Sequence, residues 1–165
     1  MKPRDLIIRD ERSDDLATVR EILKAAFERD DEALLVDALR EAGDAVISLV
    51  AEEHERLVGY INLSTMTAPF AALALAPLSV IPDRQGNGIG SALIREALFR
   101  AKRHWDAVFV LGDPRFYARF GFDVHVASGY ASPYAGPHFM GIALSDTLPV
   151  SSGTLLHAAA FAALK

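Results

Sequence analysis

The chain has 165 residues, 51% of them hydrophobic and 24% charged, which predicts one soluble globular domain spanning residues 1–165. Its formal net charge of −5 argues against a nucleic-acid partner, because phosphate backbones are bound by clustered lysines and arginines. The absence of cysteine excludes disulfides, zinc–thiolate sites and cysteine nucleophiles. No apolar run reaches the ~18 residues of a membrane span, so we expect no membrane partner and a cytoplasmic location.

The first third of the chain predicts a strand, two helices and a hairpin. Residues 6–9 (LIIR) suit a short strand, and residues 13–27 begin with helix-capping side chains and carry apolar residues at helical spacing. A second short helix fits residues 32–41. Residues 45–53 and 56–66 are rich in β-branched residues and roughly alternate, which predicts two antiparallel strands.

The middle of the chain predicts a strand–helix–strand unit. Residues 72–82 (ALALAPLSVIP) form the first strand, but a proline cannot donate to a sheet ladder, so we expect a bulge or splay near residues 77–79. The apolar spacing of SALIREALFRAKR predicts a helix, and residues 107–111 (AVFVL) suit a buried strand. Two strands joined through a helix should be parallel.

The last third predicts a short helix followed by further strands. Asp113 can cap the helix RFYARF, and Gly121 can end it. Residues 122–127 and 138–144 are predicted strands joined by a loop rich in Gly, Pro and Ser. The C-terminal segment fits either an edge strand at residues 154–157 or a short helix, and periodicity leaves both open.

A glycine cluster, PDRQGNGIG at residues 82–90, lies between the bulged strand and its helix. Glycine weakens a helix by roughly 1 kcal/mol relative to alanine, so three glycines at this point predict a close approach to the main chain. Unpaired N–H groups where a helix begins favour an anion such as a phosphate or pyrophosphate, and Arg84 could add a bidentate contact. A mononucleotide loop does not fit, because no lysine lies between Leu57 and Lys102, and G-x-G-x-G departs from the dinucleotide fingerprint.

Gln85, Gly88 and Gly90 do satisfy the pattern Q-x-x-G-x-G, and residues 116–122 (FYARFGF) satisfy FYxxxGF at a suitable distance. The two motifs together resemble the cofactor-binding segments of the GCN5-related N-acetyltransferase (GNAT) superfamily, and their surroundings look most like its YhbS-type acetyltransferases. This resemblance implies an α/β (α+β) fold. It consists of a mixed, mostly antiparallel twisted sheet with a central splayed pair of parallel strands, flanked by about four helices.

The same resemblance implies an enzyme that transfers an acetyl group from acetyl-CoA, as co-substrate, directly to a primary amine. The backbone of the glycine turn would hold the pyrophosphate, and the end of the bulged strand would pair with the pantetheine arm. Tyr117 would be catalytic, giving its proton to the leaving thiolate, and the N–H of Val80 would bind the thioester carbonyl oxygen. The implied cofactor-binding residues are Leu78, Ser79, Val80, Arg84, Gln85, Gly86, Asn87, Gly88, Ile89, Gly90, Ser91 and Tyr117.

The sequence assigns no general base, because the bulged strand contains no Asp or Glu. Glu52, Glu53 and His54 lie near the hairpin turn and are expected to point into water, whereas Asp113 is expected to cap a helix. Glu32 could face an acceptor cleft from the second helix, and a chain of water molecules is an equal alternative.

Other functions stay open beside the enzyme. The missing strand carboxylate suits a catalytically inactive acyl-CoA-binding sensor or regulatory module, and the apolar tail LLHAAAFAAL suits a dimerisation module or a homodimer. Taken alone, Tyr117 fits a half-buried core residue, and Arg84 fits a solvated turn. The five histidines show no ligand spacing, so we expect no metal, and nothing in the sequence identifies the small-molecule or protein amine.

Overall fold

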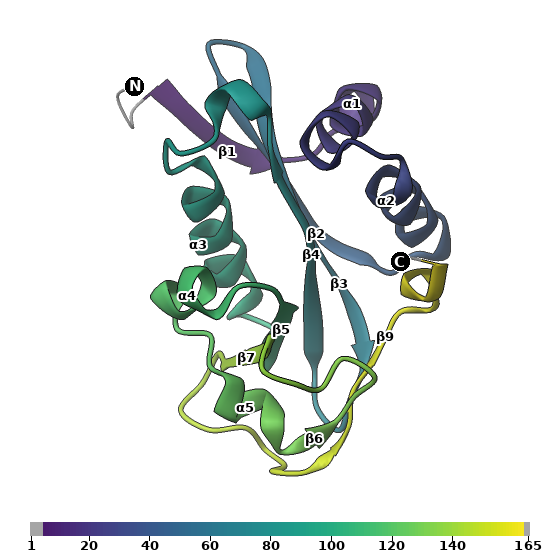
Figure 1. Cartoon of the computed structure of the whole chain (residues 1–165), viewed down its shortest axis with the longest axis vertical. Coiled ribbons are helices and arrows are strands. Elements are labelled where there is room, and N and C mark those ends of the chain that lie inside the picture. Colours follow the sequence, from purple (N-terminus) through teal and green to yellow (C-terminus); the bar gives the residue numbers. More distant parts are fainter. Residues whose placement is uncertain (1–4, 164–165) are drawn as a thin grey trace.

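The structure, a computed structural model, describes residues 5–163 and is built around a twisted seven-stranded sheet (Figure 1). Six strands follow the order β1-β2-β3-β4-β5-β7, and β9 pairs with the end of β3. The bounds are β1 Leu6–Asp10, β2 Ala45–Glu53, β3 Arg56–Thr67, β4 Ala72–Val80, β5 Ala107–Leu111, β7 Phe139–Ala143 and β9 Leu156–His157. The β4–β5 pair is parallel and the other pairs of this sheet are antiparallel, which confirms the predicted fold class.

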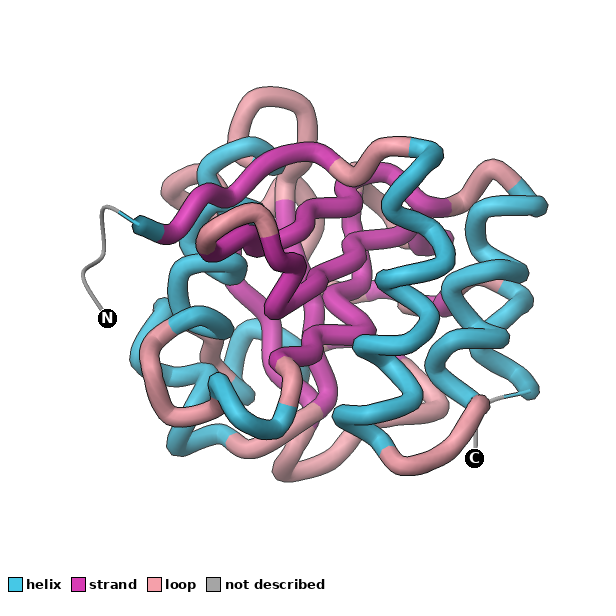
Figure 2. Tube along the Cα trace, turned by 90° about the horizontal axis from the view of Figure 1, so that it is seen from above, coloured by secondary structure: helices cyan, strands magenta, loops and turns pink. Residues whose placement is uncertain are grey.

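Helices cover both faces of this sheet (Figure 2). Helices α1 and α2 lie on one face and α3 on the other, whereas α4 and α5 are short and follow β5 in the chain. The helix bounds are α1 Leu16–Phe27, α2 Asp31–Ala42, α3 Ile89–Ala101, α4 Pro114–Tyr117 and α5 Val124–Ser128. Single turns of 3₁₀ helix are η2 Ser13–Asp15, η3 Pro82–Arg84, η4 Ala118–Phe120 and η5 Ala159–Ala163. A two-stranded sheet joins β6 (Tyr130–Ala131) to β8 (Gly153–Thr154).

Burial on both faces explains the apolar character of the central strands. Val50 and Tyr60 pack with α1 and α2, whereas Leu49 and Ile61 pack with α3, and all four are fully buried. Successive side chains of a strand point to opposite faces, so a strand covered on both sides carries few polar positions. The predicted helices are confirmed by the bounds above, and the hairpin is confirmed by the antiparallel pairing of β2 and β3.

The predicted splay occurs at Pro77. Strand β4 pairs with β5 only from Ala72 to Ala74, although both strands continue beyond that point. On its other side, Leu75 and Leu78 of β4 lie opposite Leu63 and Ile61, so Ala76 and Pro77 form a bulge. The two parallel strands consequently separate over the half of β4 that precedes the glycine turn.

The prediction of a strand at residues 122–127 is wrong. Asp123 makes an isolated bridge to Gly141, and the chain then forms α5, whose first turn is capped by the Asp123 carboxylate accepting from the N–H of His125 at 2.8 Å. The alternation of FDVHVA suits a strand, but a capping aspartate at its second position favours a helix start. The strand predicted at residues 138–144 is confirmed as β7.

The C-terminal segment combines both alternatives, because β8 and β9 precede the turn η5. Leu155 and Phe161 are buried within the chain, whereas Leu156 is 44% exposed. Phe161 packs against Leu35 and Leu39 of α2. Position 164 of the predicted apolar tail lies outside the described residues. Among residues 5–163, no helix is both long and apolar enough to cross a membrane.

Candidate functional site

The glycine turn holds a row of N–H groups that the protein leaves unbonded. Gly86 and Gly88 have φ of 79° and 81°, a conformation that favours glycine, and the α3 ladder begins when Ala92 donates to the carbonyl of Gly88 at 3.1 Å. Within the described residues, the N–H groups of positions 86–91 have no protein acceptor, and no side chain caps α3. These donors and the positive end of the helix dipole favour an anion at this point.

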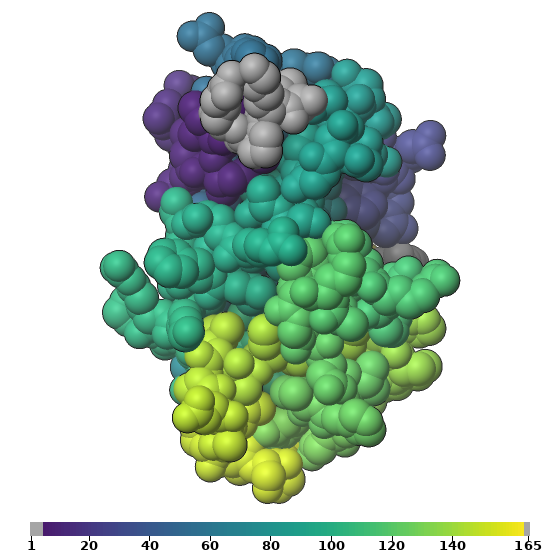
Figure 3. All heavy atoms as spheres, turned by 90° about the vertical axis from the view of Figure 1, so that its left-hand side faces the viewer, coloured from purple at the N-terminus to yellow at the C-terminus, as the bar shows by residue number. Residues whose placement is uncertain are grey.

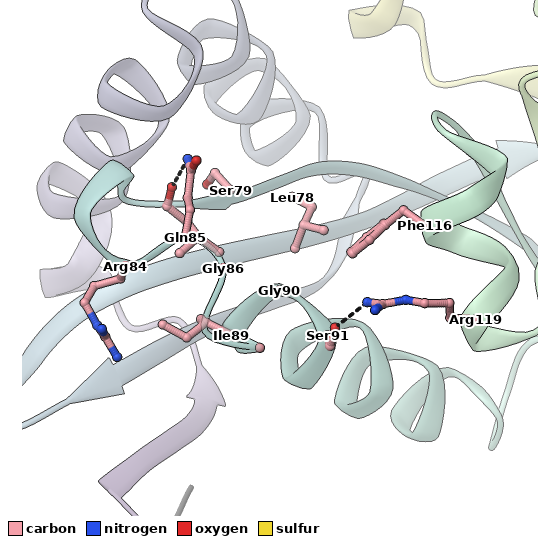
Figure 4. Close-up of a pocket in the computed structure, with 12 residues that line it drawn as sticks. Leu78, Ser79, Arg84, Gln85, Gly86, Ile89, Gly90, Ser91, Phe116 and Arg119 are labelled. Carbon is pink, nitrogen blue, oxygen red and sulfur yellow. Dashed lines mark hydrogen bonds between the residues drawn. The ribbon is translucent and has the colours of Figure 1, made fainter. Parts of the chain in front are cut away.

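Side-chain amides hold this turn in shape. The Gln85 amide donates to the carbonyl of Val80 at 3.0 Å (Figure 4). The Asn87 amide donates to the carbonyls of Arg84 and Gln85 at 3.1 and 3.0 Å. Both residues were predicted to bind the cofactor. Their side chains satisfy carbonyl groups of the turn and leave its N–H groups unbonded.

Arg84 has a carboxylate partner within the protein. Its guanidinium donates to both carboxylate oxygens of Glu53, at 2.7 and 2.9 Å, and this pairing holds the pKa of Glu53 below its ordinary value. The phosphate contact of Arg84 stays a prediction. The prediction that Glu52 and Glu53 point into water is wrong, because Glu53 is 5% exposed and Glu52 accepts two hydrogen bonds from Arg9.

A groove of about 490 Å³ opens over the unbonded N–H groups. Its walls are the end of β4, the glycine turn, the first turn of α3, and the side of α4 and η4 that carries Phe116 and Arg119 (Figure 4). All the predicted cofactor residues except Asn87 and Tyr117 line it: Leu78, Ser79, Val80, Arg84, Gln85, Gly86, Gly88, Ile89, Gly90 and Ser91.

The edge of β4 offers main-chain groups to this groove. Val80 lies opposite Gly59, and the neighbouring N–H of Ile81 donates to the carbonyl of Val58 at 2.9 Å. This bonding identifies Val80 as a non-hydrogen-bonded position of the antiparallel ladder, so its N–H and carbonyl point away from β3 and towards the gap. Leu78 is two residues earlier in the continuous register and has the same orientation.

Sequence reasoning missed Phe116 and Arg119. Arg119 donates to the Ser91 hydroxyl at 3.0 Å, and its guanidinium carbon lies 4.9 Å from the centre of the Phe116 ring and 5.3 Å from that of Phe120. No carboxylate within residues 5–163 pairs with Arg119. Figure 3 shows the α3 segment, in teal, beside the green α4–η4 segment. The i, i+3 spacing of Phe116 and Arg119 was the available signal, because such residues share one helix face.

A second, smaller cavity of about 190 Å³ lies beyond Leu78, whose side chain borders both spaces. Tyr117 forms part of its wall, with Pro77 and Leu111 at the parted strands and Phe27, Glu32 and Leu35 from the α1–α2 side. Two residues that the sequence singled out meet here, since Glu32 of the second helix and Tyr117 both line this cavity.

Tyr117 is half-buried and keeps its proton. Burial raises its pKa from 10.0 to about 12, and its hydroxyl has no hydrogen-bond partner among the described residues. Its ring packs edge-on against Phe116 and Phe122, with centroids 5.0 and 5.7 Å away. Gly112 makes room for the ring, because a Cβ at that position would lie 2.6 Å from Cε2 of Tyr117.

Two other acidic residues that the sequence singled out have hydrogen-bond partners within the chain. Asp113 caps α4 by accepting from the N–H of Arg115 at 2.9 Å, as predicted. Glu32 accepts from Arg29 through both of its oxygens, one of them at 2.9 Å. Over the range 5–163, no group of three or more histidine and acidic side chains is placed to hold a metal ion.

Comparison with known proteins identifies relatives over most of the chain. The acetyltransferase (GNAT) domain family matches residues 44–124. The uncharacterized N-acetyltransferase YhbS of Escherichia coli (strain K12) is 36% identical over 124 residues, which are 72% of this chain and 74% of that protein.

Solved structures agree with this relationship. The GNAT family N-acetyltransferase YhbS from Escherichia coli, in complex with CoA, has a TM-score of 0.91 and 30% identity, covering 98% of this chain and 94% of its own. A GNAT family acetyltransferase from Brucella melitensis, in complex with acetyl-CoA, has a TM-score of 0.80 and 35% identity, covering 94% and 97%.

Proposed function

This chain belongs to the GNAT family of acetyltransferases, and we propose that it transfers an acetyl group from acetyl-CoA directly to a primary amine of a small molecule or protein. The observation that carries this proposal is the row of unbonded N–H groups at positions 86–91, in a groove that leads past Leu78 to a protonated tyrosine. Its support from relatives is that similar structures were solved with CoA and with acetyl-CoA.

The groove suits each part of the co-substrate. The pyrophosphate would lie against the N–H groups of the turn, where the helix dipole contributes a few tenths to ~1 kcal/mol per charge at an exposed site. The amide groups of the pantetheine arm would pair with the main-chain groups that β4 points towards the gap at Leu78, as an added strand does. Arg119 adds a cation that faces the same groove.

The reaction needs no covalent enzyme intermediate. The amine nitrogen would form a bond to the thioester carbonyl carbon while the carbon–sulfur bond breaks, giving an amide and a thiolate. The N–H of Val80 would bind the carbonyl oxygen, and Tyr117 would give its proton to the thiolate. The proton lost by the amine returns to Tyr117 through solvent, so the sum is one amide and one free thiol.

Isothermal titration with acetyl-CoA, followed by thiol release across a panel of amines, tests the proposal. We expect saturable binding and release of free CoA only when an accepted amine is present. Absence of binding at millimolar acetyl-CoA would exclude the function, and so would binding to an unrelated groove in a crystal structure.

A sensor that binds acyl-CoA without turnover is the second candidate. The observation that favours it is that the carboxylates near the site, Glu53 and Glu32, are paired with arginines, which leaves no free carboxylate within residues 5–163 at the parted strands. Binding without thiol release, for every amine tested, would select the sensor. The predicted homodimer stays a prediction, although Leu155 and Phe161 of its apolar tail are buried within the chain itself.

A further inference from the structure

The small cavity beyond Leu78 is lined mainly by apolar side chains. Its wall is formed by apolar side chains of α1, α2, β4 and β5, together with the Tyr117 ring. Glu32 is the charged residue of this lining. Such a wall offers one hydrogen-bonding carboxylate and otherwise favours an apolar body.

The Glu32 carboxylate has hydrogen-bonding capacity left. Arg29 donates to both of its oxygens through Nε and Nη2, as a fork on one edge of the carboxylate. An ionised carboxylate has about four lone-pair sites, and a bidentate arginine uses two of them. The Glu32 side chain is 6% exposed and that of Arg29 is 43% exposed, so the arginine lies towards solvent and the carboxylate towards the interior.

Building on the proposed function, we propose that this cavity receives a small primary amine with an apolar body, and that Glu32 accepts a hydrogen bond from the amino group. Arg29 pairs with Glu32 and also lies 3.6 Å from Asp31, so Glu32 is not an isolated anion in this wall. The neutral amine is the form that attacks a thioester, and its N–H can donate to the Glu32 carboxylate. Glu32 and Tyr117 would both border the space that holds the reacting nitrogen and sulfur.

The size and polarity of the cavity define the class of acceptor. A volume of about 190 Å³ holds roughly six water-sized groups at ~30 Å³ each, which is a short alkyl or small arylalkyl amine. A carboxylate on the acceptor would be buried near Glu32 without a cation, and a second ammonium would be buried against apolar side chains. Amino acids and polyamines should therefore be poor acceptors.

Three matched amines test this class directly. We would titrate n-butylamine, 4-aminobutanoate and 1,4-diaminobutane into the CoA-saturated protein at pH 8.5 and measure affinity by calorimetry. We expect n-butylamine to bind at least tenfold more tightly than either charged analogue. Shortening the alkyl chain should weaken binding about fourfold per methylene, which is the effect of burying one CH₂ group. Equal affinities for the three compounds would overturn the inference.

Glu32→Gln tests the residue, with Asp31→Asn as its matched control. Asp31 is the neighbouring acid, lies 3.6 Å from Arg29, and is absent from the cavity lining among the described residues. Both variants remove one negative charge beside the same arginine. We expect Glu32→Gln to weaken n-butylamine about tenfold with unchanged acetyl-CoA affinity, and Asp31→Asn to change neither by more than twofold. Identical amine affinities in the two variants would contradict the role of Glu32.

The two levels of proposal fail in different ways. If acetyl-CoA binds and supports thiol release only with carboxylate-bearing or polycationic acceptors, the acceptor class is wrong and the acetyltransferase function stands. If acetyl-CoA does not bind, the function is wrong, and titration of the amines into the free protein still decides the cavity. The amine series on the unchanged protein gives this answer even if Glu32→Gln fails to fold.

Discussion

The groove over the glycine turn and the cavity beside Tyr117 meet at Leu78 but are built from different parts of the chain. The groove is formed mainly by a continuous segment, residues 78–91, and presents main-chain N–H groups. The cavity collects side chains from five separate elements, and its polar side chains are a tyrosine and a glutamate. Changes to the backbone should therefore alter affinity for the co-substrate, whereas changes to cavity side chains should alter turnover.

The largest effect is expected from Tyr117→Phe. Removing the proton donor should lower kcat about 100-fold, the lower end of the range for a general acid, with acetyl-CoA affinity kept within twofold. Steady-state thiol release and calorimetry measure the two quantities. Unchanged kcat would contradict a role of Tyr117 in the chemistry. An equal loss of acetyl-CoA affinity would contradict the separate roles of the groove and the cavity.

Gly88→Ala should lower the affinity for acetyl-CoA, which Tyr117→Phe should leave unchanged. A Cβ there projects into open space but strains a residue at φ 81°, so the turn must shift and misplace its N–H donors. Hydrogen bonds to charged groups contribute about 1.5–3 kcal/mol, so we expect acetyl-CoA affinity to fall at least tenfold.

Gly43→Ala is the matched control for Gly88→Ala. Gly43 ends α2 at φ 76°, also with nothing near its Cβ position, and lies outside both sites among the described residues. The melting temperature should fall by a similar amount in both variants, whereas only Gly88→Ala should lose affinity. Equal acetyl-CoA affinity in the two variants would contradict a main-chain anion site.

Arg119→Gln tests whether a side chain of the groove binds the phosphates of CoA. Arg119 lacks a carboxylate partner within residues 5–163 and should contribute to binding the phosphates of CoA, so affinity should fall roughly tenfold at low salt and less at high salt. Pantetheine, which carries no phosphate, should show no difference. Arg115→Gln is the control, because that side chain is 92% exposed and pairs with Asp113. Equal losses for CoA and pantetheine would contradict a phosphate contact.

The last prediction concerns alkaline stability, outside the pH range in which the enzyme would work. The pKa of Tyr117 is about 12 in the folded chain and 10.0 as its ordinary value, so between pH 10 and 12 the unfolded chain releases a proton that the folded chain keeps. The Tyr117 contribution to stability is complete below pH 10 and falls by up to about 1.4 kcal/mol per pH unit above it. Denaturant unfolding of Tyr117→Phe across this range should give a shallower decline than the unchanged protein, and an identical decline would contradict the raised pKa.

The sequence predicted the parts that depend on neighbouring residues. The glycine turn, the bulge at Pro77, the parallel β4–β5 pair and the cap at Asp113 each follow from local backbone chemistry, and the structure confirms them. The groove was predictable for the same reason, because main-chain donors need only the correct spacing of glycines. The family resemblance supplied the position of Tyr117, which no periodicity would have singled out.

The error at Glu53 arises because a distant residue decides the outcome. Glu53 was expected in water beside the hairpin turn, yet it pairs with Arg84, 31 positions later. Nothing in the local sequence of either residue indicates the other. From the sequence, the place of Glu32 in a cleft was one of two alternatives, because the approach of Glu32 to Tyr117 depends on how α2 packs over the sheet.

Gln85 and Asn87 have a consequence for kinetics. Their amides brace the turn before any ligand arrives, so capture of the co-substrate does not wait for a loop to become ordered. Association should therefore be limited by encounter and electrostatic guidance, and free and occupied forms should superimpose closely through this segment.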